Sequence, residues 1–270
     1  MYIDQNKLML LNKYEDYSLT EEDYKNVFCQ NNYLQYFIKK DNIIYHVREA
    51  FANIEDYLIN ELICQEVAKY LKVQTVDSIP ATYDTKNIVL LSKLFTNKNQ
   101  KIGYITNFNV RFSSDIENLK TLDRYSFNEK DYVVLNKESK EKLIIALKKM
   151  IICDFITLQT DRHENNFLFS FNDKNAKLLP LYDYELSFFT KFHENDNYFQ
   201  FDLDKESVLS YIREDKTFQQ LLKRIMNLNI GMIDKNLIKK GIYLNSGEKF
   251  IYGELINERK DIIKEKKLII

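Results

Sequence analysis

The segment that most restricts how this chain can fold is 140–158 (KEKLIIALKKMIICDFITL). On a helix, the second half of this segment carries apolar residues on almost every side. A helix of this kind is buried, so other elements must pack around it, and Ser139 is available as its N-cap. The chain has enough apolar mass for such a core, because 45% of its 270 residues are hydrophobic. We therefore expect a buried central helix.

The residues before this helix have the patterns of a sheet that carries one helix. Residues 33–48 contain two runs rich in Tyr, Phe, Ile and Val, separated by Lys40-Asp41-Asn42, which is the pattern of a hairpin. Residues 54–71 carry apolar side chains at helical spacing, and residues 88–95 (IVLLSKLF) fit a buried strand. We expect residues 1–96 to form an α+β lobe.

The residues after the central helix are mostly helical in pattern. Two amphipathic stretches, 205–227 and 254–266, follow the helix, with one small hairpin before them. We expect residues 97–270 to form a helical lobe. The fold class is then α+β, with a β-rich N-terminal lobe and a mostly helical C-terminal lobe. A ligand site is expected in the cleft between them.

The charge balance excludes several classes of function. The chain has 39 Lys and Arg residues against 40 Asp and Glu residues, a net charge of −1. No global basic field exists to hold nucleic acid or an anionic membrane, so we expect direct binding to neither. No stretch approaches the roughly 18 apolar residues that span a bilayer. We also expect neither a signal peptide nor a membrane anchor.

The cysteines indicate a compartment. The chain has three cysteines, an odd number: Cys29, Cys64 and Cys153. They lie far apart in the sequence, and each lies in an apolar stretch. This pattern is typical of buried free thiols in a reducing compartment, and it fits neither disulfides nor a metal site. We expect a cytoplasmic protein.

The segment after the buried helix is the most informative part of the chain. It begins with a polar stretch, TDRHENN (160–166), and continues with a strand-like run, FLFSF (167–171). A turn-like stretch (172–175) then leads to the return run AKLLPLYD (176–183). The pattern predicts a hairpin with polar residues at its open end.

Three oxygen-bearing side chains are expected to converge at this end of the hairpin. Antiparallel pairing of residues 167–171 with residues 178–182 places Asn166 opposite Asp183. Asp161 lies five residues before Asn166, on the loop that leads into the hairpin. The hairpin therefore presents an amide and a carboxylate side by side, with a second carboxylate nearby.

This set of side chains suits phosphoryl transfer. Such a reaction needs Mg²⁺ to bridge phosphate oxygens and a carboxylate to orient the acceptor hydroxyl. Asn166 and Asp183 supply the oxygen ligands that magnesium prefers, and Asp161 supplies the second carboxylate. Protein kinases place a catalytic Asp, an Asn five residues later and a second Asp after a hairpin, which is the spacing seen here.

The form Asp-x-His-x-x-Asn, in MIICDFITLQTDRHENN (150–166) and followed by LLPLYDYELSF (178–188), resembles the catalytic core of the HipA-like kinases. It is also similar to the Asp-Arg-His-x-x-Asn loop of phosphatidylinositol 3- and 4-kinases. The resemblance extends to INELICQEVAKYLKV (59–73) and IVLLSKLF (88–95), and covers about residues 33–190.

The resemblance implies a two-lobed protein-kinase-like fold and an ATP-dependent serine/threonine protein kinase. By family resemblance Asp161 is the catalytic aspartate, and Asn166 and Asp183 are the magnesium ligands. The cofactors implied are ATP and Mg²⁺. The partners implied are a protein substrate with a Ser or Thr acceptor and an antitoxin, because HipA-like toxins form toxin–antitoxin pairs.

The family's nucleotide-binding lysine lies on the strand before the first-lobe helix, and the aligned residue here is Arg48. An arginine can hold phosphate, although its planar fork places the charge differently from an ammonium group. Lys39 and Lys40 on the neighbouring strand, and Lys93, are the alternatives for this role. No glycine precedes Gly103, so a glycine-rich loop over the phosphates is absent.

Two further nucleotide contacts are expected. Glu61, midway along the first-lobe helix, is expected to pair with the phosphate-holding cation, as a helix glutamate does in protein kinases. The alternative is a solvated glutamate on the helix surface. The strand that ends near Phe95 and the segment through Tyr104 are expected to form the adenine side of the hinge.

Two residues of the polar loop have structural interpretations. His163 is expected to pack within the loop, and Arg162 is a surface or ion-paired residue. The missing glycines and Arg48 leave open a second function, a pseudokinase or nucleotide-sensing binding module. A third alternative, suggested by the Asp-Arg-His form, is a kinase of lipids or small molecules.

Overall fold

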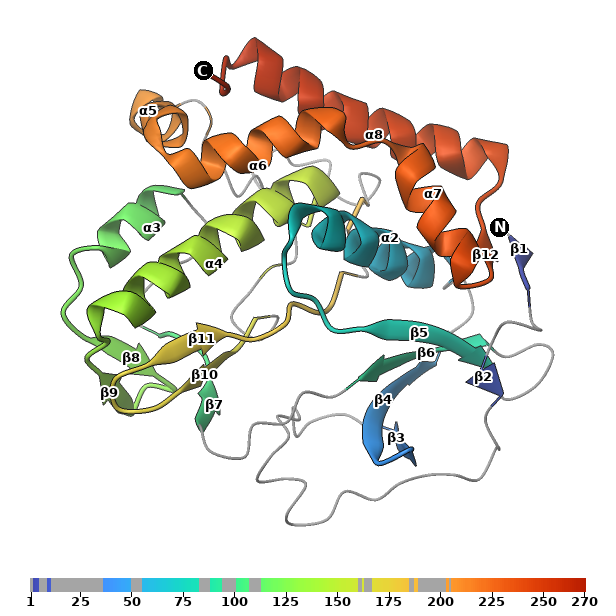
Figure 1. Ribbon diagram of the computed structural model, residues 1–270, viewed down its shortest axis with the longest axis horizontal. Coiled ribbons are helices and arrows are strands. Elements are labelled where there is room, and N and C mark those ends of the chain that lie inside the picture. Colours follow the sequence, from blue (N-terminus) through green and yellow to red (C-terminus); the bar gives the residue numbers. More distant parts are fainter. Residues whose placement is uncertain are drawn as a thin grey trace.

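One sheet and one helix make up the N-terminal part of the structure, a computed structural model (Figure 1). The sheet has the strand order β2-β5-β6-β4-β3, in which β2 and β5 are parallel and the other pairs are antiparallel. Its strands are β2 (Met9–Leu10), β3 (Tyr36–Lys40), β4 (Ile43–Glu49), β5 (Ser78–Thr82) and β6 (Ile88–Lys93). The residues described are 2–4, 9–10, 36–49, 55–82, 88–93, 101–106, 113–159, 162, 167–184, 187–188, 203 and 205–270.

Strands β3 and β4 confirm the predicted hairpin. They pair from Tyr36 with Val47 to Lys40 with Ile43, which leaves a two-residue turn. Asp41 and Asn42 form this turn with φ angles of 51° and 62°. Two consecutive left-handed residues match the twist of the flanking strands, and Asp and Asn tolerate this backbone better than other side chains.

Helix α2 (Glu55–Leu71) confirms the helix predicted over 54–71. It lies between the sheet and the helices of the C-terminal part (Figure 1). Because it contacts neighbours on both sides, a wide arc of its surface is buried. This arc includes polar side chains such as Glu61 and Gln65 among the apolar residues Leu58, Ile59, Leu62, Ile63 and Val67.

Helix α4 (Lys137–Thr157) is the buried central helix that the sequence predicts. Its start differs from the prediction, because Asn136 and not Ser139 is the N-cap. The Asn136 side chain accepts a hydrogen bond from the Ser139 backbone N–H at 2.8 Å. The Ser139 hydroxyl instead donates to the Ala176 carbonyl and accepts from the Ala176 N–H, which fastens the first turn of α4 to a neighbouring strand.

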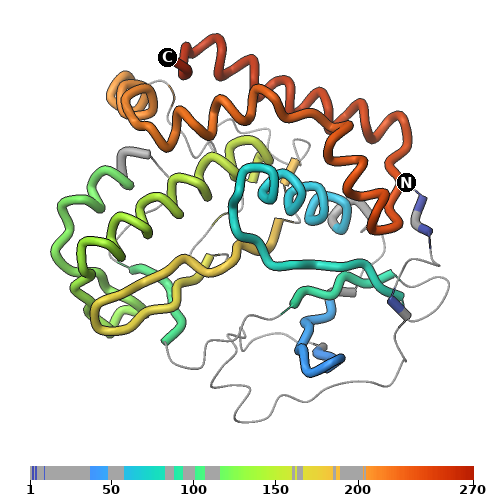
Figure 2. The backbone as a smooth tube through the Cα atoms, in the orientation of Figure 1, coloured from blue at the N-terminus to red at the C-terminus, as the bar shows by residue number. Residues whose placement is uncertain are grey.

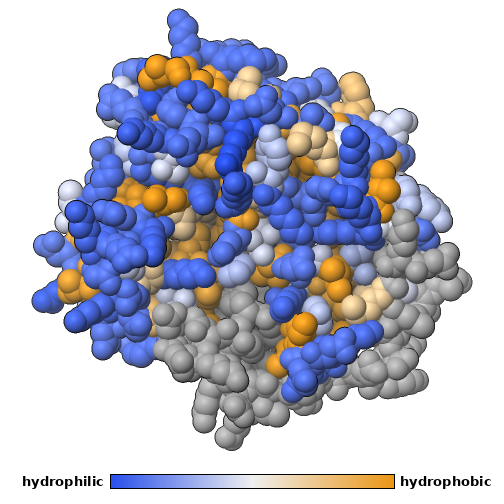
Figure 3. Space-filling view, in the orientation of Figure 1, coloured by the Kyte–Doolittle hydropathy of each residue, from blue (hydrophilic) through white to orange (hydrophobic). Residues whose placement is uncertain are grey.

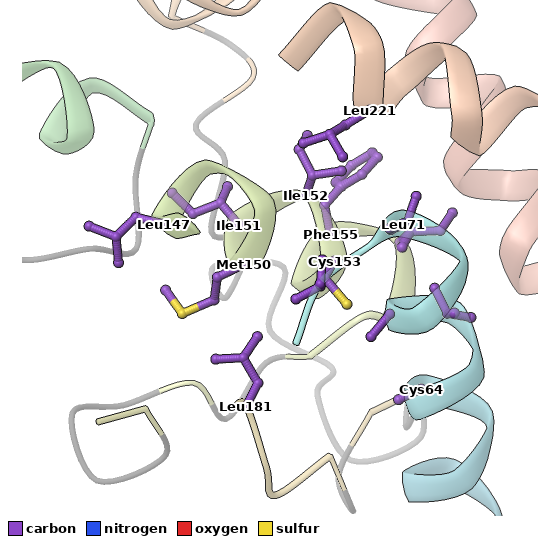
Figure 4. Packing of buried hydrophobic residues seen from close by; sticks show 14 of the residues in the cluster. Cys64, Leu71, Leu147, Met150, Ile151, Ile152, Cys153, Phe155, Leu181 and Leu221 are labelled. Atoms are coloured by element: carbon purple, nitrogen blue, oxygen red, sulfur yellow. The ribbon is translucent and has the colours of Figure 1, made fainter. Parts of the chain in front are cut away.

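Helix α4 packs against α2, the shorter helix α3 (Ser113–Leu119), α6 (Lys216–Asn227) and α8 (Ser246–Glu265). Figure 4 shows α4 side chains beside Leu71 of α2, Leu221 of α6, and Leu181, which follows β11. The largest hydrophobic cluster is continuous across these elements. The core is therefore built around α4.

The amphipathic stretch predicted over 205–227 is two helices and not one. Helix α5 (Glu206–Glu214) ends at Asp215, and α6 starts there. The Asp215 carboxylate accepts hydrogen bonds from the N–H groups of Thr217 and Phe218, so it caps α6. It also pairs with Lys148 of α4. The remaining helices are α7 (Ile230–Lys239) and α8, which contains the predicted 254–266 stretch.

The C-terminal part contains more strands than the single hairpin predicted there. Strands β10 (Phe169–Phe171) and β11 (Ala176–Leu178) form the predicted hairpin, and β7 (Lys101–Gly103) joins its free edge. A second hairpin consists of β8 (Tyr125–Phe127) and β9 (Asp131–Val133). Strands β1 (Tyr2–Ile3) and β12 (Ile242–Tyr243) pair near the N-terminus. These strands have two or three residues each, too few for a periodic pattern to reveal.

The register of the β10–β11 hairpin corrects the sequence-based prediction by two residues. Phe169 pairs with Leu178, whereas the predicted register places it opposite Pro180. The Asn172 side chain accepts hydrogen bonds from the N–H groups of Lys174 and Asn175, which closes a tighter turn. A shift of two residues keeps each side chain on the same face. Asn166 lies outside the described residues, so its position opposite Asp183 stays a prediction.

The chain after β11 joins the N-terminal part of the molecule. Leu181 forms a parallel bridge with Thr75, in the connection from α2 to β5. The Leu181 N–H donates to the Gln74 carbonyl, and the Leu181 carbonyl accepts from the Val76 N–H. Figure 2 shows the two connections side by side. The segment that leads from β11 to Asp183 is thus hydrogen-bonded to the connection between α2 and β5.

The α+β class is confirmed, with an antiparallel-sheet N-terminal region and a helical C-terminal region. The predicted boundary between residues 96 and 97 lies outside the described residues and stays a prediction. Within the described ranges, no helix is long and apolar enough to cross a bilayer.

Replacing Ile156 by Ala should lower the free energy of unfolding by about 2–5 kcal/mol, because the change leaves a cavity in the core around α4. Ile156 is 0% exposed. Ile145→Ala is the matched control on the same helix, because Ile145 is 42% exposed, and it should cost less than about 1 kcal/mol. Urea unfolding of both variants measures the difference. Equal losses would contradict the central position of α4.

Candidate active site

The end of α4 turns the chain toward the predicted catalytic loop. Leu158 is left-handed, with φ 51° and ψ 41°, and its N–H donates to the Asp154 carbonyl. The Gln159 N–H donates to the same carbonyl at 2.9 Å. A leucine in this conformation costs roughly 1–2 kcal/mol. The bend therefore needs the contacts that follow it to remain stable.

Arg162 makes the strongest of these contacts. Its guanidinium donates through Nε and Nη2 to the two carboxylate oxygens of Asp154, each at 3.0 Å. Its Nη1 donates to the Tyr182 carbonyl at 3.0 Å. The guanidinium carbon lies 4.7 Å from the centre of the Tyr184 ring. One side chain thus joins α4, the loop beside Asp161 and the strand that leads to Asp183.

Both charges of this pair are buried, with side-chain exposures of 1% each. Burial disfavours the charged guanidinium, but the Asp154 carboxylate outweighs this effect, and the pKa of Arg162 is raised above its ordinary value. A buried pair survives desolvation only when its geometry is good and its remaining donors are satisfied. The two parallel bonds to Asp154 give the pair good geometry, and the Tyr182 carbonyl accepts a hydrogen bond from a further guanidinium N–H. Arg162 is therefore an ion-paired residue and not a surface residue.

Asp183 is held by hydrogen bonds to the backbone on both of its sides. Its carbonyl accepts from the Gln159 side chain at 2.5 Å. The next N–H, of Tyr184, donates to Glu61 Oε2 at 2.6 Å. Asp183 itself is left-handed, with a φ of 63°, which aspartate tolerates better than most residues. Its side chain is half-buried between the buried residues Leu181 and Tyr184.

Glu61 brings the N-terminal helix into this arrangement. Its side chain is 1% exposed, which excludes a solvated glutamate. Oε1 accepts a hydrogen bond from Gln65 at 3.2 Å, while Oε2 accepts from Tyr184. The Gln65 side-chain oxygen accepts in turn from the Ser78 N–H at the start of β5. The pairing of Glu61 with a phosphate-holding cation stays a prediction.

The segment after Asp183 returns to α4. The Phe188 N–H donates to the Thr157 carbonyl at 2.9 Å. Phe188 is left-handed, with φ 59°, an unfavourable backbone for an aromatic residue. Its ring packs edge-on against Tyr252 of α8, with 5.4 Å between ring centres. Strained residues often lie in functional segments, and both Asp183 and Phe188 have a left-handed backbone.

Two of the cysteines lie beside this site. Cys64 and Cys153 are free and 0% exposed, as predicted, while Cys29 lies outside the described residues. Burial raises the pKa of the Cys153 thiol to about 12 and that of Cys64 well above its ordinary value. The Cys153 sulfur lies 3.6 Å from the Tyr184 hydroxyl. Both thiols are therefore protonated packing residues.

Several predicted site residues lie outside the described residues. They are Asp161, Asn166, His163 and Phe95. Their roles stay predictions, supported only by neighbours such as Arg162 whose placement is described.

The predicted phosphate-holding cations lie on the N-terminal sheet. Arg48 is on β4, where its backbone pairs with Leu90 of β6, and its side chain is outside the described set. Lys93 ends β6 and is exposed, and Lys39 of β3 is also exposed. Their roles as phosphate contacts stay predictions.

Sequence patterns did not identify Asp154, Gln159 or Tyr184 as members of the site. Asp154 was part of the predicted central helix, and a carboxylate in an otherwise apolar half-helix was the available signal. A buried acid needs a partner, and Arg162 follows Asp154 eight residues later in the sequence. The Gln159 and Tyr184 contacts join segments distant in sequence, and spacing carries no signal for such contacts.

The fold is similar to those of two proteins of known structure. It resembles the Helicobacter pylori proinflammatory kinase CtkA, with a TM-score of 0.58 and 16% identity over 90% of this chain and 93% of that one. It also resembles HipA of Shewanella oneidensis MR-1, solved in a toxin–antitoxin complex with HipB and operator DNA. That TM-score is 0.50, with 12% identity over 94% of this chain and 66% of HipA.

The sequence matches no protein-family model, and no curated protein sequence matches it. The structural similarity nevertheless confirms the HipA-like kinase resemblance at the level of the fold.

Replacing Asp154 by Asn should lower the free energy of unfolding by about 3–5 kcal/mol, because it leaves the buried Arg162 charge without its carboxylate. Asp131→Asn is the control, since Asp131 pairs with Lys101 at the surface and should contribute less than about 1 kcal/mol. Urea unfolding measures both. A loss for Asp154→Asn no larger than for Asp131→Asn would show that the buried pair does not hold this site together.

Proposed function

We propose that this protein is an ATP- and Mg²⁺-dependent serine/threonine protein kinase of the HipA-like type. The observation that supports this most directly is the Arg162 contact set. Arg162 is the residue next to Asp161 in the sequence. Its contacts join it to the Asp154 carboxylate and to the carbonyl of Tyr182, the residue before Asp183. In this proposal the two carboxylates that the reaction requires, Asp161 and Asp183, are the sequence neighbours of Arg162 and Tyr182, which this contact set joins.

Each residue has a distinct role in this proposal. Asp161 accepts a hydrogen bond from the acceptor hydroxyl and orients it. Asp183 and Asn166 are the oxygen donors for magnesium, and their chemistry fits this hard cation. Magnesium, when bound, neutralises part of the charge of the phosphates. Gln159 and Glu61 are positioning residues, because they hold the peptide groups on either side of Asp183.

The phosphate-holding cation is proposed to be Arg48, with Lys93 as the alternative, and Glu61 to be its partner. Phe95 is proposed to lie on the adenine side of the hinge. The substrate is proposed to be a protein with a Ser or Thr acceptor, and the protein to act in the cytoplasm without a membrane. An antitoxin is a proposed partner, since the related HipA was solved together with HipB.

Asp161→Asn should lose more than about 90% of phosphoryl transfer, a rise in barrier above about 1.4 kcal/mol, because the amide no longer accepts the hydroxyl proton. Nucleotide binding should persist. Transfer is measured as radiolabel from ATP incorporated into the protein itself and into casein, with magnesium present. Asp173→Asn, an exposed change in the β10–β11 turn, should retain wild-type transfer. Equal transfer by both variants would contradict the assignment.

Asp183→Asn should weaken the enhancement of ATP affinity by magnesium, because it removes the charged ligand while keeping a side chain that tolerates a positive φ. Calorimetric titration of ATP with and without Mg²⁺, on wild type and variant, measures this. Equal enhancement in both proteins would exclude Asp183 as a metal ligand. Magnesium-dependent ATP binding by wild type without any transfer would instead establish the pseudokinase alternative.

A further inference from the structure

A groove of about 650 Å³ is lined by residues from three parts of the fold. Its walls are the first half of α4 and the β10–β11 hairpin, and the connection from α2 to β5 contributes residues 72–74. All of the residues that line it belong to the described ranges. Figure 3 shows apolar surface bordered by hydrophilic side chains in this region.

The rim of the groove is basic. Lys72, Lys142, Lys149 and Lys177 line it, and Glu138 is the one acid among the described lining residues. Glu138 pairs with Lys142 at 2.5 Å, and both side chains remain more than two-thirds exposed. Four positive charges against one negative charge give a local excess of three, on a chain whose net charge is −1. The excess is therefore a property of this groove and not of the whole surface.

The floor of the groove is apolar. Leu143, Leu178 and Leu179 line it together with Val73, and Ile145 lies on the rim with 42% of its surface exposed. None of the described residues that line the groove is aromatic, so the floor offers no stacking surface for the bases of a nucleic acid. A peptide with an apolar side chain among acidic ones matches both the floor and the rim.

One end of the groove offers peptide-like hydrogen-bonding groups. The Asn136 and Asn175 side chains meet there, with Asn136 Nδ2 donating to Asn175 Oδ1 at 2.7 Å. Both residues line the groove. Carboxamides supply donors and acceptors of the kind that a peptide backbone pairs with.

We propose that this groove binds an acidic peptide segment of a partner protein, with an apolar side chain seated on the floor and carboxylates paired with the lysine rim. The walls are a helix and a hairpin, both with ordered hydrogen bonding, so the groove is preformed. Binding here involves neither Asp161 nor Asp183 and does not depend on phosphoryl transfer.

The probe is a short fluorescein-labelled peptide in which leucines are interspersed among glutamates, and fluorescence anisotropy with the full-length protein measures its affinity. We expect saturable binding that weakens with added salt. The double variant Lys142→Glu/Lys177→Glu should bind at least about ten-fold more weakly, because it reverses two rim charges. Lys223→Glu/Lys235→Glu makes the same charge change on exposed residues of α6 and α7, and should stay within about two-fold of wild type.

Two further measurements test the apolar floor and the class of ligand. Ile145→Ser, and separately a peptide with serines in place of leucines, should each weaken binding. An equal loss for the two charge-reversed proteins would overturn the proposal in favour of nonspecific attraction. Unchanged affinity in Lys142→Glu/Lys177→Glu would overturn it by excluding the groove. Displacement of the peptide by single-stranded DNA as effectively as by unlabelled peptide would overturn it in favour of a phosphate-binding surface.

Discussion

The Asp154–Arg162 ion pair is the interaction on which the rest of this site depends. Moving two charges into the interior costs several kcal/mol for each ion, so the pair needs good geometry and further contacts to the guanidinium. Two directions meet Asp154, a third meets the Tyr182 carbonyl, and the planar face lies over Tyr184. A lysine has no planar fork and cannot reproduce this set. The end of α4 and the strand before Asp183 therefore form a single unit.

A second set of contacts joins this unit to the N-terminal part of the molecule. Glu61 of α2 accepts from the Tyr184 N–H, and Leu181 is hydrogen-bonded on both sides to the connection between α2 and β5. The backbone that carries Asp183 is thus held from the helical region and from the sheet region together. A change in the position of α2 would act directly on Asp183, because a buried carboxylate that loses its N–H partner carries a large desolvation cost.

The elements with strong periodic patterns were predictable, and the contacts between distant segments were not. The central helix, the β3–β4 hairpin and α2 follow from apolar spacing and turn residues. The N-cap is Asn136 and not Ser139, because Asn136, three positions earlier, also has a side chain that can accept from the first-turn N–H groups. The predicted hairpin register was wrong because the Asn172 side chain closes a tighter turn. Asp183 was predicted from its motif, but the neighbouring hydrogen bond from the Tyr184 N–H to Glu61 joins residues 123 positions apart and depends on tertiary packing.

Helix α4 also determines how the groove and the site are related in space. Lys142, on the groove, and Asp154, in the site, are twelve residues apart on this helix, a separation of about 18 Å along its axis. Lys149 also lines the groove and is only five residues from Asp154, about 7.5 Å along the axis. Two or three extended residues at roughly 3.3 Å each span this shorter distance. An acidic segment held in the groove would leave a Ser or Thr a few residues away within reach of the Asp154–Arg162 pair, and Arg162 adjoins the proposed catalytic Asp161 in sequence.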